Sequence, residues 1–219
     1  MANMKEPREL FLHELGDILY AENMLVKVLP QLSREASDRE LKQGFDRHLR
    51  ETKQQVENVK KAFKALGEPV KAEQCPGIEG LKREHDQFVQ EEKPAAAVLN
   101  AFLTGAAART EHYEIAAYTG LITMARAMGE KQVVTLLERN LKQEKATLKK
   151  IESIARRLAK DGAKKAKEDG GTSRSRSRRS TSTRSRSATT RSRASAARRT
   201  TGRSRASSSS RSRASTRKR

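Results

Sequence analysis

Apolar residues recur at intervals of three and four along most of the first 160 residues, and this spacing constrains the fold more than any other feature. Such spacing places the apolar side chains on one face of an α-helix. No stretch shows sustained alternation of apolar and polar residues with the β-branched side chains that are typical of half-buried strands. The pattern therefore predicts an all-α domain.

Start and stop signals divide this region into four long helices. The predicted helices cover about residues 7–35, 38–66, 95–128 and 130–160. Within the first of them, Pro30 is expected to kink the helix or to end it nearby, because proline cannot donate the helical hydrogen bond. Asp38, with Ser37 before it, is expected to cap the second helix, and Gly67 is expected to end it.

The connection over residues 67–94 is too long for a hairpin between helices. Apolar residues from Ile78 to Val89 predict a short amphipathic helix inside it. One long crossover between two helix pairs is the connectivity of a ferritin-like four-helix bundle. At about 160 residues the region suits one domain, so residues 1–160 are assigned to the bundle and residues 161–219 to a tail.

Ionisable residues interrupt each apolar stripe near the middle of its helix. These residues are Glu22, His48, Glu51, Glu111, Glu114 and Glu144. In a bundle of roughly equal helices they should lie at one level and converge. Buried carboxylates lose solvation and repel one another, and divalent cations remove that conflict. Carboxylate oxygens with an imidazole suit iron or manganese, so the pattern predicts two such ions bridged by glutamate. The alternative is that each acid sits at a solvated edge of its helix.

Four stretches carry a resemblance to a known family. They are LHELGDILYAENML, FDRHLRETKQQVENVKKAF, RTEHYEIAAYTGL and LLERNLKQEKATLKKI, and they resemble the bacterial YciE/YciF ferritin-like proteins over about residues 5–160. The resemblance implies a dimeric di-metal bundle that is associated with bacterial stress responses and has a poorly defined activity. It implies that the core acids are Glu22, Glu51, Glu111 and Glu144, with Glu114 and His48 as further ligands.

Two positions depart from the usual di-iron pattern. Typical di-iron bundles carry Glu-x-x-His on the second and fourth helices. Here Gln54 and Thr147 stand three residues after Glu51 and Glu144, where histidines are expected. His48, one turn before Glu51, can replace one imidazole. The sequence therefore leaves open whether the protein is an enzyme. If it is one, we expect a di-iron or di-manganese oxidoreductase.

The tail has a different chemistry. Thr172 to Arg219 contains sixteen Arg, one Lys and no acid, and thus holds most of the net charge of +20. With almost no apolar side chain larger than Ala, it is expected to be disordered and to bind nucleic acid, above all DNA, without sequence preference. The candidate contacts are Arg174, Arg176, Arg178, Arg179, Arg184, Arg186, Arg191 and Arg193. Acidic membranes or acidic proteins are alternative partners, and a purely solubilising extension is a third possibility.

Cellular location follows from what the sequence lacks. A single cysteine, Cys75, cannot form an internal disulfide, and no apolar run reaches the length of a signal peptide or a membrane span. We therefore expect a cytoplasmic protein that its tail could hold at the nucleoid. Two functions remain: iron or peroxide handling near DNA by a metal-binding stress protein, or a nucleic-acid-associated structural role with a catalytically idle bundle.

Overall fold

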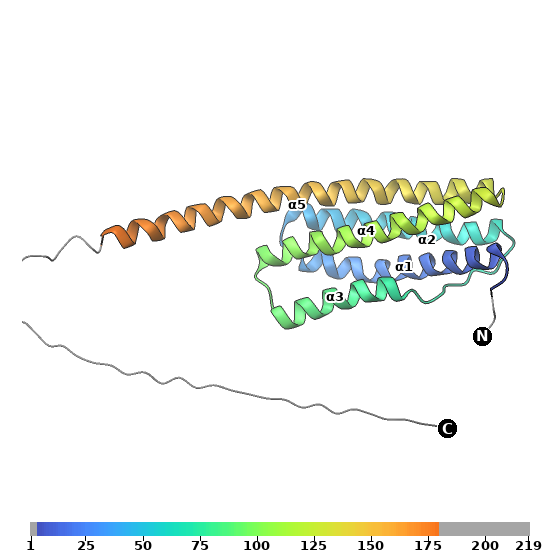
Figure 1. Ribbon diagram of the computed structural model, residues 1–219, viewed down its shortest axis with the longest axis horizontal. Helices are drawn as coiled ribbons and strands as arrows, with labels where there is room; N and C mark the ends of the chain where they lie inside the picture. Colours follow the sequence, from blue (N-terminus) through green and yellow to red (C-terminus); the bar gives the residue numbers. More distant parts are fainter. Residues whose placement is uncertain (1–3, 180–219) are drawn as a thin grey trace, which may run out of the picture. The chain divides into compact units, whose positions relative to one another are not determined.

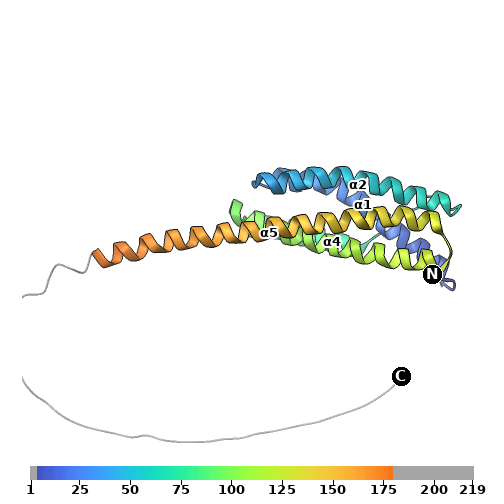
Figure 2. The same ribbon diagram turned by 90° about the horizontal axis from the view of Figure 1, so that it is seen from above.

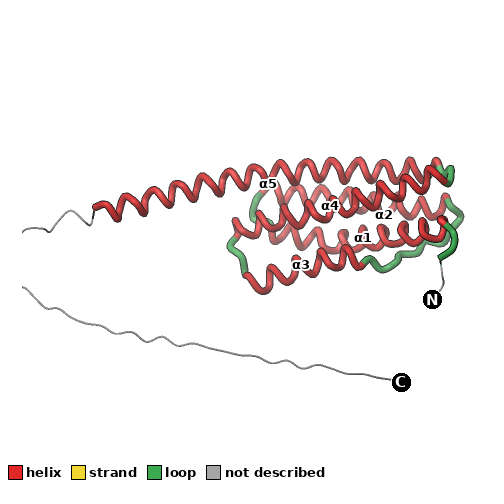
Figure 3. The backbone as a smooth tube through the Cα atoms, in the orientation of Figure 1, coloured by secondary structure: helices red, strands yellow, loops and turns green. Residues whose placement is uncertain are grey.

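Five α-helices and no strand make up the described part of the chain, residues 4–179 of the computed structural model (Figures 1 and 3). The helices are α1 (Pro7–Glu35), α2 (Arg39–Ala65), α3 (Pro76–Glu92), α4 (Ala96–Ala127) and α5 (Lys131–Arg179). The four long helices form the bundle, and α3 is the short helix of the crossover. The predicted all-α, ferritin-like architecture is therefore confirmed.

Local caps explain most of the helix boundaries. The Asp38 carboxylate accepts a hydrogen bond from the Leu41 backbone N–H at 2.9 Å and so begins α2 as predicted. Gly67 follows α2 with a φ of 74°, a left-handed conformation that glycine adopts without steric cost. Pro30 lies inside α1, which continues to Glu35. Packing outweighs the lost hydrogen bond there, because Leu29 is buried one residue before the proline.

The core lies between the long helices and is built from their apolar stripes. Its largest fully buried apolar side chains are Phe11, Leu15, Ile18, Leu19, Leu41, Ile78, Leu103, Leu121, Leu137 and Ile154. Each such side chain contributes about 1.5–3 kcal/mol by leaving water. Most residues of the predicted apolar stripes thus lie on the buried faces of the helices, whereas Val98 of α4 is exposed.

The crossover is held directly on α1. The Glu73 backbone N–H donates to the Gly16 carbonyl at 3.0 Å. A Cβ atom at Gly16 would lie 2.8 Å from the Glu73 Cγ and 2.9 Å from the Lys71 carbonyl oxygen. Glycine at this position therefore lets the connection approach the helix backbone closely enough to pair with it.

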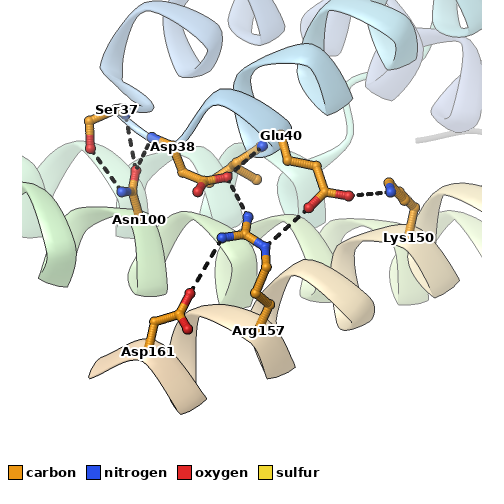
Figure 4. Close-up of polar contacts among 8 residues, drawn as sticks. Ser37, Asp38, Glu40, Asn100, Lys150, Arg157 and Asp161 are labelled. Carbon is orange, nitrogen blue, oxygen red and sulfur yellow. Dashed lines mark hydrogen bonds and ion pairs between the residues drawn. The ribbon is translucent and has the colours of Figure 1, made fainter. Parts of the chain in front are cut away.

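Ion pairs fasten α5 to the start of α2 (Figure 4). Arg157 donates to Asp38 at 2.7 Å and to Glu40 at 3.1 Å, and Lys150 also donates to Glu40. The Arg157 guanidinium holds the pKa of Asp38 below its ordinary value. One turn further along α5, Asp161 lies 3.8 Å from Arg157. The two helices therefore run antiparallel, with the end of the bundle part of α5 beside the cap of α2.

The fourth long helix extends beyond its predicted end near Lys160. Helix α5 continues to Arg179, past the predicted boundary between bundle and tail at residue 161. Residues 161–167 are exposed and add nothing to the core. They include two Ala and three Lys, which favour helix without any packing partner. Residues 180–219 lie outside the described part of the chain, and so does the disorder predicted for them.

No helix among the described residues combines the length and the apolar character needed to cross a lipid bilayer.

Candidate metal centre

Four helices bring buried ionisable side chains to one level of the bundle. Glu22 comes from α1, His48 from α2, Glu111 and Glu114 from α4, and Glu144 from α5. Their exposed fractions range from 0 to 4%. The sequence predicted this convergence because the interruptions fall at the middle of helices of similar length.

Four of these residues can share one ion. His48, Glu111, Glu114 and Glu144 each offer a ligand atom, and all four atoms lie within 4.8 Å of one another. The residues come from three different helices, so only the folded bundle assembles them. This buried His/Glu group could hold a metal ion.

Glu22 and Glu51 border this group. Glu22 is fully buried and accepts a hydrogen bond from the Tyr118 hydroxyl. Glu51 has a side chain that is 29% exposed, and one of its oxygens lies 4.0 Å from the His48 Nδ1. The Thr147 hydroxyl donates to that same oxygen at 3.3 Å. The structure therefore places Glu51 at the edge of the centre, and its role as a ligand stays a prediction.

The electrostatics of the centre disfavour a full set of negative charges. Burial raises the pKa of Glu22, Glu114 and Glu144 well above the ordinary range, and their neighbouring carboxylates raise it further. Burial also raises the pKa of Glu111 to about 7. Without a counter-charge, Glu22, Glu114 and Glu144 therefore favour their protonated forms at neutral pH.

Several ligand atoms of the centre have no hydrogen-bond partner among the described residues. They are both oxygens of Glu114, one oxygen each of Glu22, Glu111 and Glu144, and both ring nitrogens of His48. The His48 Nε2 does lie 3.1 Å from a Glu111 oxygen, but not in hydrogen-bonding geometry. Buried polar atoms left unpaired cost about 1–3 kcal/mol each. One imidazole and several carboxylates form a donor set that fits iron or manganese.

A polar network continues from the centre toward one end of the bundle. The Asn140 amide donates to the Tyr118 hydroxyl at 2.9 Å, and the Asn58 amide donates to Asn140 at 2.7 Å. Gln55 donates to Glu144. All four of these network residues are buried, so the polar interior is larger than the six predicted residues.

The sequence held a signal for this network. Gln55 and Asn58 follow Glu51 by four and seven residues, and Asn140 precedes Glu144 by four. These intervals repeat one face of a helix. Polar residues at such positions extend the same interruption of the apolar stripe.

Two hollows lead to the centre. A small cavity of about 50 Å³ between α1, α3 and α4 reaches His48 and Glu111 and is lined mainly by apolar side chains, among them Leu25 and Leu81. A groove of about 370 Å³ between α2 and α5 reaches His48, Glu51 and Thr147. The smaller hollow holds more than one water-sized molecule but no large substrate. Small molecules could therefore reach the centre from two sides.

The arginines predicted to contact nucleic acid divide into two groups. Arg174, Arg176, Arg178 and Arg179 belong to α5, whereas Arg184, Arg186, Arg191 and Arg193 lie outside the described residues. Nucleic-acid binding by either group stays a prediction.

Comparison with known proteins finds relatives over the bundle. The family model described as "Domain of unknown function (DUF892)" matches residues 6–164. Protein YciF of Escherichia coli K12 is 36% identical over 154 residues, which are 70% of this chain and 92% of that protein. The matches therefore cover the bundle and leave out most of the tail.

Solved structures agree with this comparison. The E. coli stress protein YciF superposes with a TM-score of 0.68 at 35% identity, over 72% of this chain and 99% of that one. YcfI of Rhodopseudomonas palustris, proposed to be a structural protein, superposes with a TM-score of 0.67 at 39% identity. The match covers 68% of this chain and 95% of that one. A Xanthomonas campestris protein superposes with a TM-score of 0.58 over 74% of this chain and 99% of that one. Because the two are only 20% identical, this match shows the fold alone.

Proposed function

Because this chain belongs to the family described as a domain of unknown function, DUF892, we propose that it is a bacterial stress protein with a carboxylate centre for two Fe or Mn ions. The E. coli relative is described as a stress protein. The observation that carries the proposal is the set of buried, unpartnered ligand atoms on His48, Glu111, Glu114 and Glu144.

The ligand set indicates how a first ion would be held. His48 would supply an imidazole nitrogen, and the carboxylates of Glu111, Glu114 and Glu144 would supply hard oxygen donors. Glu22 of α1 and Glu51 of α2 border this set and would complete a second position. Bound iron or manganese would supply redox chemistry toward oxygen or peroxide.

Protein groups around the centre prepare it for that chemistry. The Tyr118 hydroxyl fixes one oxygen of Glu22, and the Gln55 amide fixes one oxygen of Glu144. Such hydrogen bonds orient carboxylates before a metal arrives. Tyr118 also holds a proton at its oxygen beside Glu22.

Metal content of the full chain, purified from its own host, tests the proposal. We expect up to two Fe or Mn per chain, and a loss of metal in Glu114→Gln and Glu144→Gln. Glu138→Gln is the matched control, since Glu138 lies on the exposed side of α5. Peroxide-dependent oxidation of added Fe²⁺ then measures turnover. Equal metal content in all three variants would contradict the proposed metal centre.

The tail supplies the second half of the proposal. Its sixteen arginines would neutralise phosphates and hold the bundle at DNA in the cytoplasm or nucleoid, where the centre would remove iron or peroxide. The resemblance to the YciE/YciF proteins further implies a homodimer, which light scattering of the full chain measures. Gel shifts with DNA at low and high salt compare the full chain with a chain that ends at Lys167. The difference between the two measures the binding that the tail contributes.

A non-catalytic structural role is the second candidate. Gln54 and Thr147 stand where di-iron bundles carry histidine, and the R. palustris relative is proposed to be structural. In this role the bundle would be a nucleic-acid-associated scaffold with an inert ion or none. Stoichiometric metal with oxidation turnover supports the first candidate, and metal without turnover supports the second.

A further inference from the structure

The helices of the bundle differ in charge. Helix α2 carries eight Lys or Arg against four Asp or Glu, and residues 131–160 of α5 carry nine against three. Helix α1 carries three against five, and α3 carries two against five. Figure 1 shows α5 and α3 at opposite edges of the bundle. One side of the bundle is therefore cationic and the opposite side is acidic.

Two rows of exposed cations account for the positive side. The row on α2 is Arg47, Arg50 and Lys53, and the row on α5 is Arg139, Lys142, Lys145 and Lys149. Intervals of three and four residues keep each row on one face of its helix, with a cation about every 5 Å. We call these seven residues the α2–α5 cationic face.

These cations are free of ion pairs among the described residues, whereas several acids on the same two helices have partners. Glu57 pairs with Lys60, Glu138 with Arg126 and Glu152 with Arg156. The paired acids do not neutralise the rows, so the positive charge of the face is available to a partner.

Grooves follow the seam between the two rows. The groove of about 370 Å³ is flanked by Arg47 and Lys150, and a neighbouring groove of about 610 Å³ is flanked by Arg139 and Lys142. Both are lined by Glu51 and Ala146, so they adjoin along the seam. The face is therefore hollowed between two positive edges.

We propose that the α2–α5 cationic face binds the phosphate backbone of duplex nucleic acid, in addition to any binding by the tail. A duplex carries one negative charge per 1.7 Å of its axis, which complements cations about 5 Å apart in two rows. Helix α5 carries one of the two rows and continues to Arg179, so this row and the arginines of residues 174–179 belong to the same helix.

A membrane surface fits this face less well. The large apolar side chains that are exposed in the described part of the chain are Met4, Leu10, Val70 and Val98, and none belongs to α2 or α5. Peripheral membrane helices combine cations with apolar side chains that enter the lipid. The face supplies only the cations, as binding to a phosphate backbone requires.

The proposal can be tested without the tail. The relatives of solved structure align over 95–99% of their lengths with at most 74% of this chain, so a bundle without the arginine tail folds. A chain that ends at Lys167 keeps the face and removes residues 168–219. Binding of a labelled 20-base-pair DNA duplex, measured by fluorescence anisotropy at several salt concentrations, reports on the face alone.

The decisive variant is Lys142→Glu with Lys145→Glu and Lys149→Glu. We expect it to weaken duplex binding at least about tenfold and to reduce the salt slope of log K by about three, one for each lost phosphate contact. The matched control is Lys27→Glu with Arg34→Glu and Arg83→Glu, three exposed cations on α1 and α3. It changes the net charge equally, and we expect binding to change less than about threefold. Thermal unfolding verifies that both variants are folded.

Four results would overturn the proposal. The first is that the chain ending at Lys167 binds no duplex, and the second is that both triple variants lose affinity equally. The third is that this chain binds acidic phospholipid vesicles but no duplex. The fourth is that the α5 variant dissociates a dimer without affecting duplex binding. An RNA duplex in the same assay distinguishes the two kinds of nucleic acid. Because the assay involves neither metal nor tail, its outcome is separate from that of the proposed function.

Discussion

At the scale of single residues, the polar interior depends on side chains that satisfy one another in a space that excludes water. Tyr118 shows this most clearly, because its buried hydroxyl donates to Glu22 and accepts from Asn140. If one partner of such a hydrogen bond is removed, the other remains as a buried polar group without a partner. Such losses cost more than the formation of an average hydrogen bond contributes.

Tyr118→Phe should therefore lower the free energy of unfolding by about 1–3 kcal/mol, since it leaves a buried Glu22 oxygen without its donor. Urea unfolding of the metal-free protein measures this. Tyr20→Phe is the control, because Tyr20 and its hydrogen-bond partner Glu79 are only half-buried, so that water can replace the lost bond. This variant should cost less than about 1 kcal/mol. Equal losses in the two variants would contradict a special role for the buried network.

Metal binding at the centre should strengthen as the pH rises. Burial raises the pKa of Glu111 to about 7, so its carboxyl must release a proton before it can bind a cation. The same shift makes the metal-free folded state bind protons more tightly than the unfolded state, so its stability falls as the pH rises from about 4.5 to 7. Competition titrations with Mn²⁺ at pH 6, 7 and 8 should show increasing affinity and proton release. An affinity that stays constant over this range would contradict the burial argument.

At the scale of elements, local signals and packing determine different features. The ends of α2 were predictable, because the Asp38 carboxylate caps its start and Gly67 follows its end in a left-handed conformation. The end of α5 was not, because beyond Lys160 the apolar stripe stops while helix-forming residues continue. An apolar pattern marks where a helix packs, and it does not mark where an exposed helix ends.

The position of α3 depends on a close contact at Gly77. A Cβ atom there would lie 2.7 Å from the Tyr113 ring, which Asp17 holds by a hydrogen bond of 3.0 Å. Gly77→Ala should therefore destabilise the protein by about 1–3 kcal/mol, as overpacking does. Gly80→Ala on the same helix meets only the Arg83 side chain at 4.0 Å, so it should be neutral or stabilise by up to about 1 kcal/mol. Thermal unfolding of the pair checks the contact, and a stable Gly77→Ala would show that α3 can shift.

At the scale of the whole molecule, the level of the centre could be predicted and its details could not. The bundle parts of the four long helices are similar in length, so their midpoints come together and Glu111, Glu114 and Glu144 meet. Rotation of each helix is set by packing. The buried face of α2 runs through His48 and residues 52, 55 and 59, and this turns Glu51 toward the groove. The separation of a basic tail from the bundle rests on charge alone and stays a prediction.

The central claim is that divalent metal ions compensate carboxylates gathered from four helices in one apolar interior. Anomalous X-ray diffraction from crystals of the full chain grown with Mn²⁺ tests it most directly. The account predicts an anomalous peak within coordination distance of His48, Glu111, Glu114 and Glu144. An interior without a peak, with these side chains still buried and Mn²⁺ bound only at the surface, would contradict it.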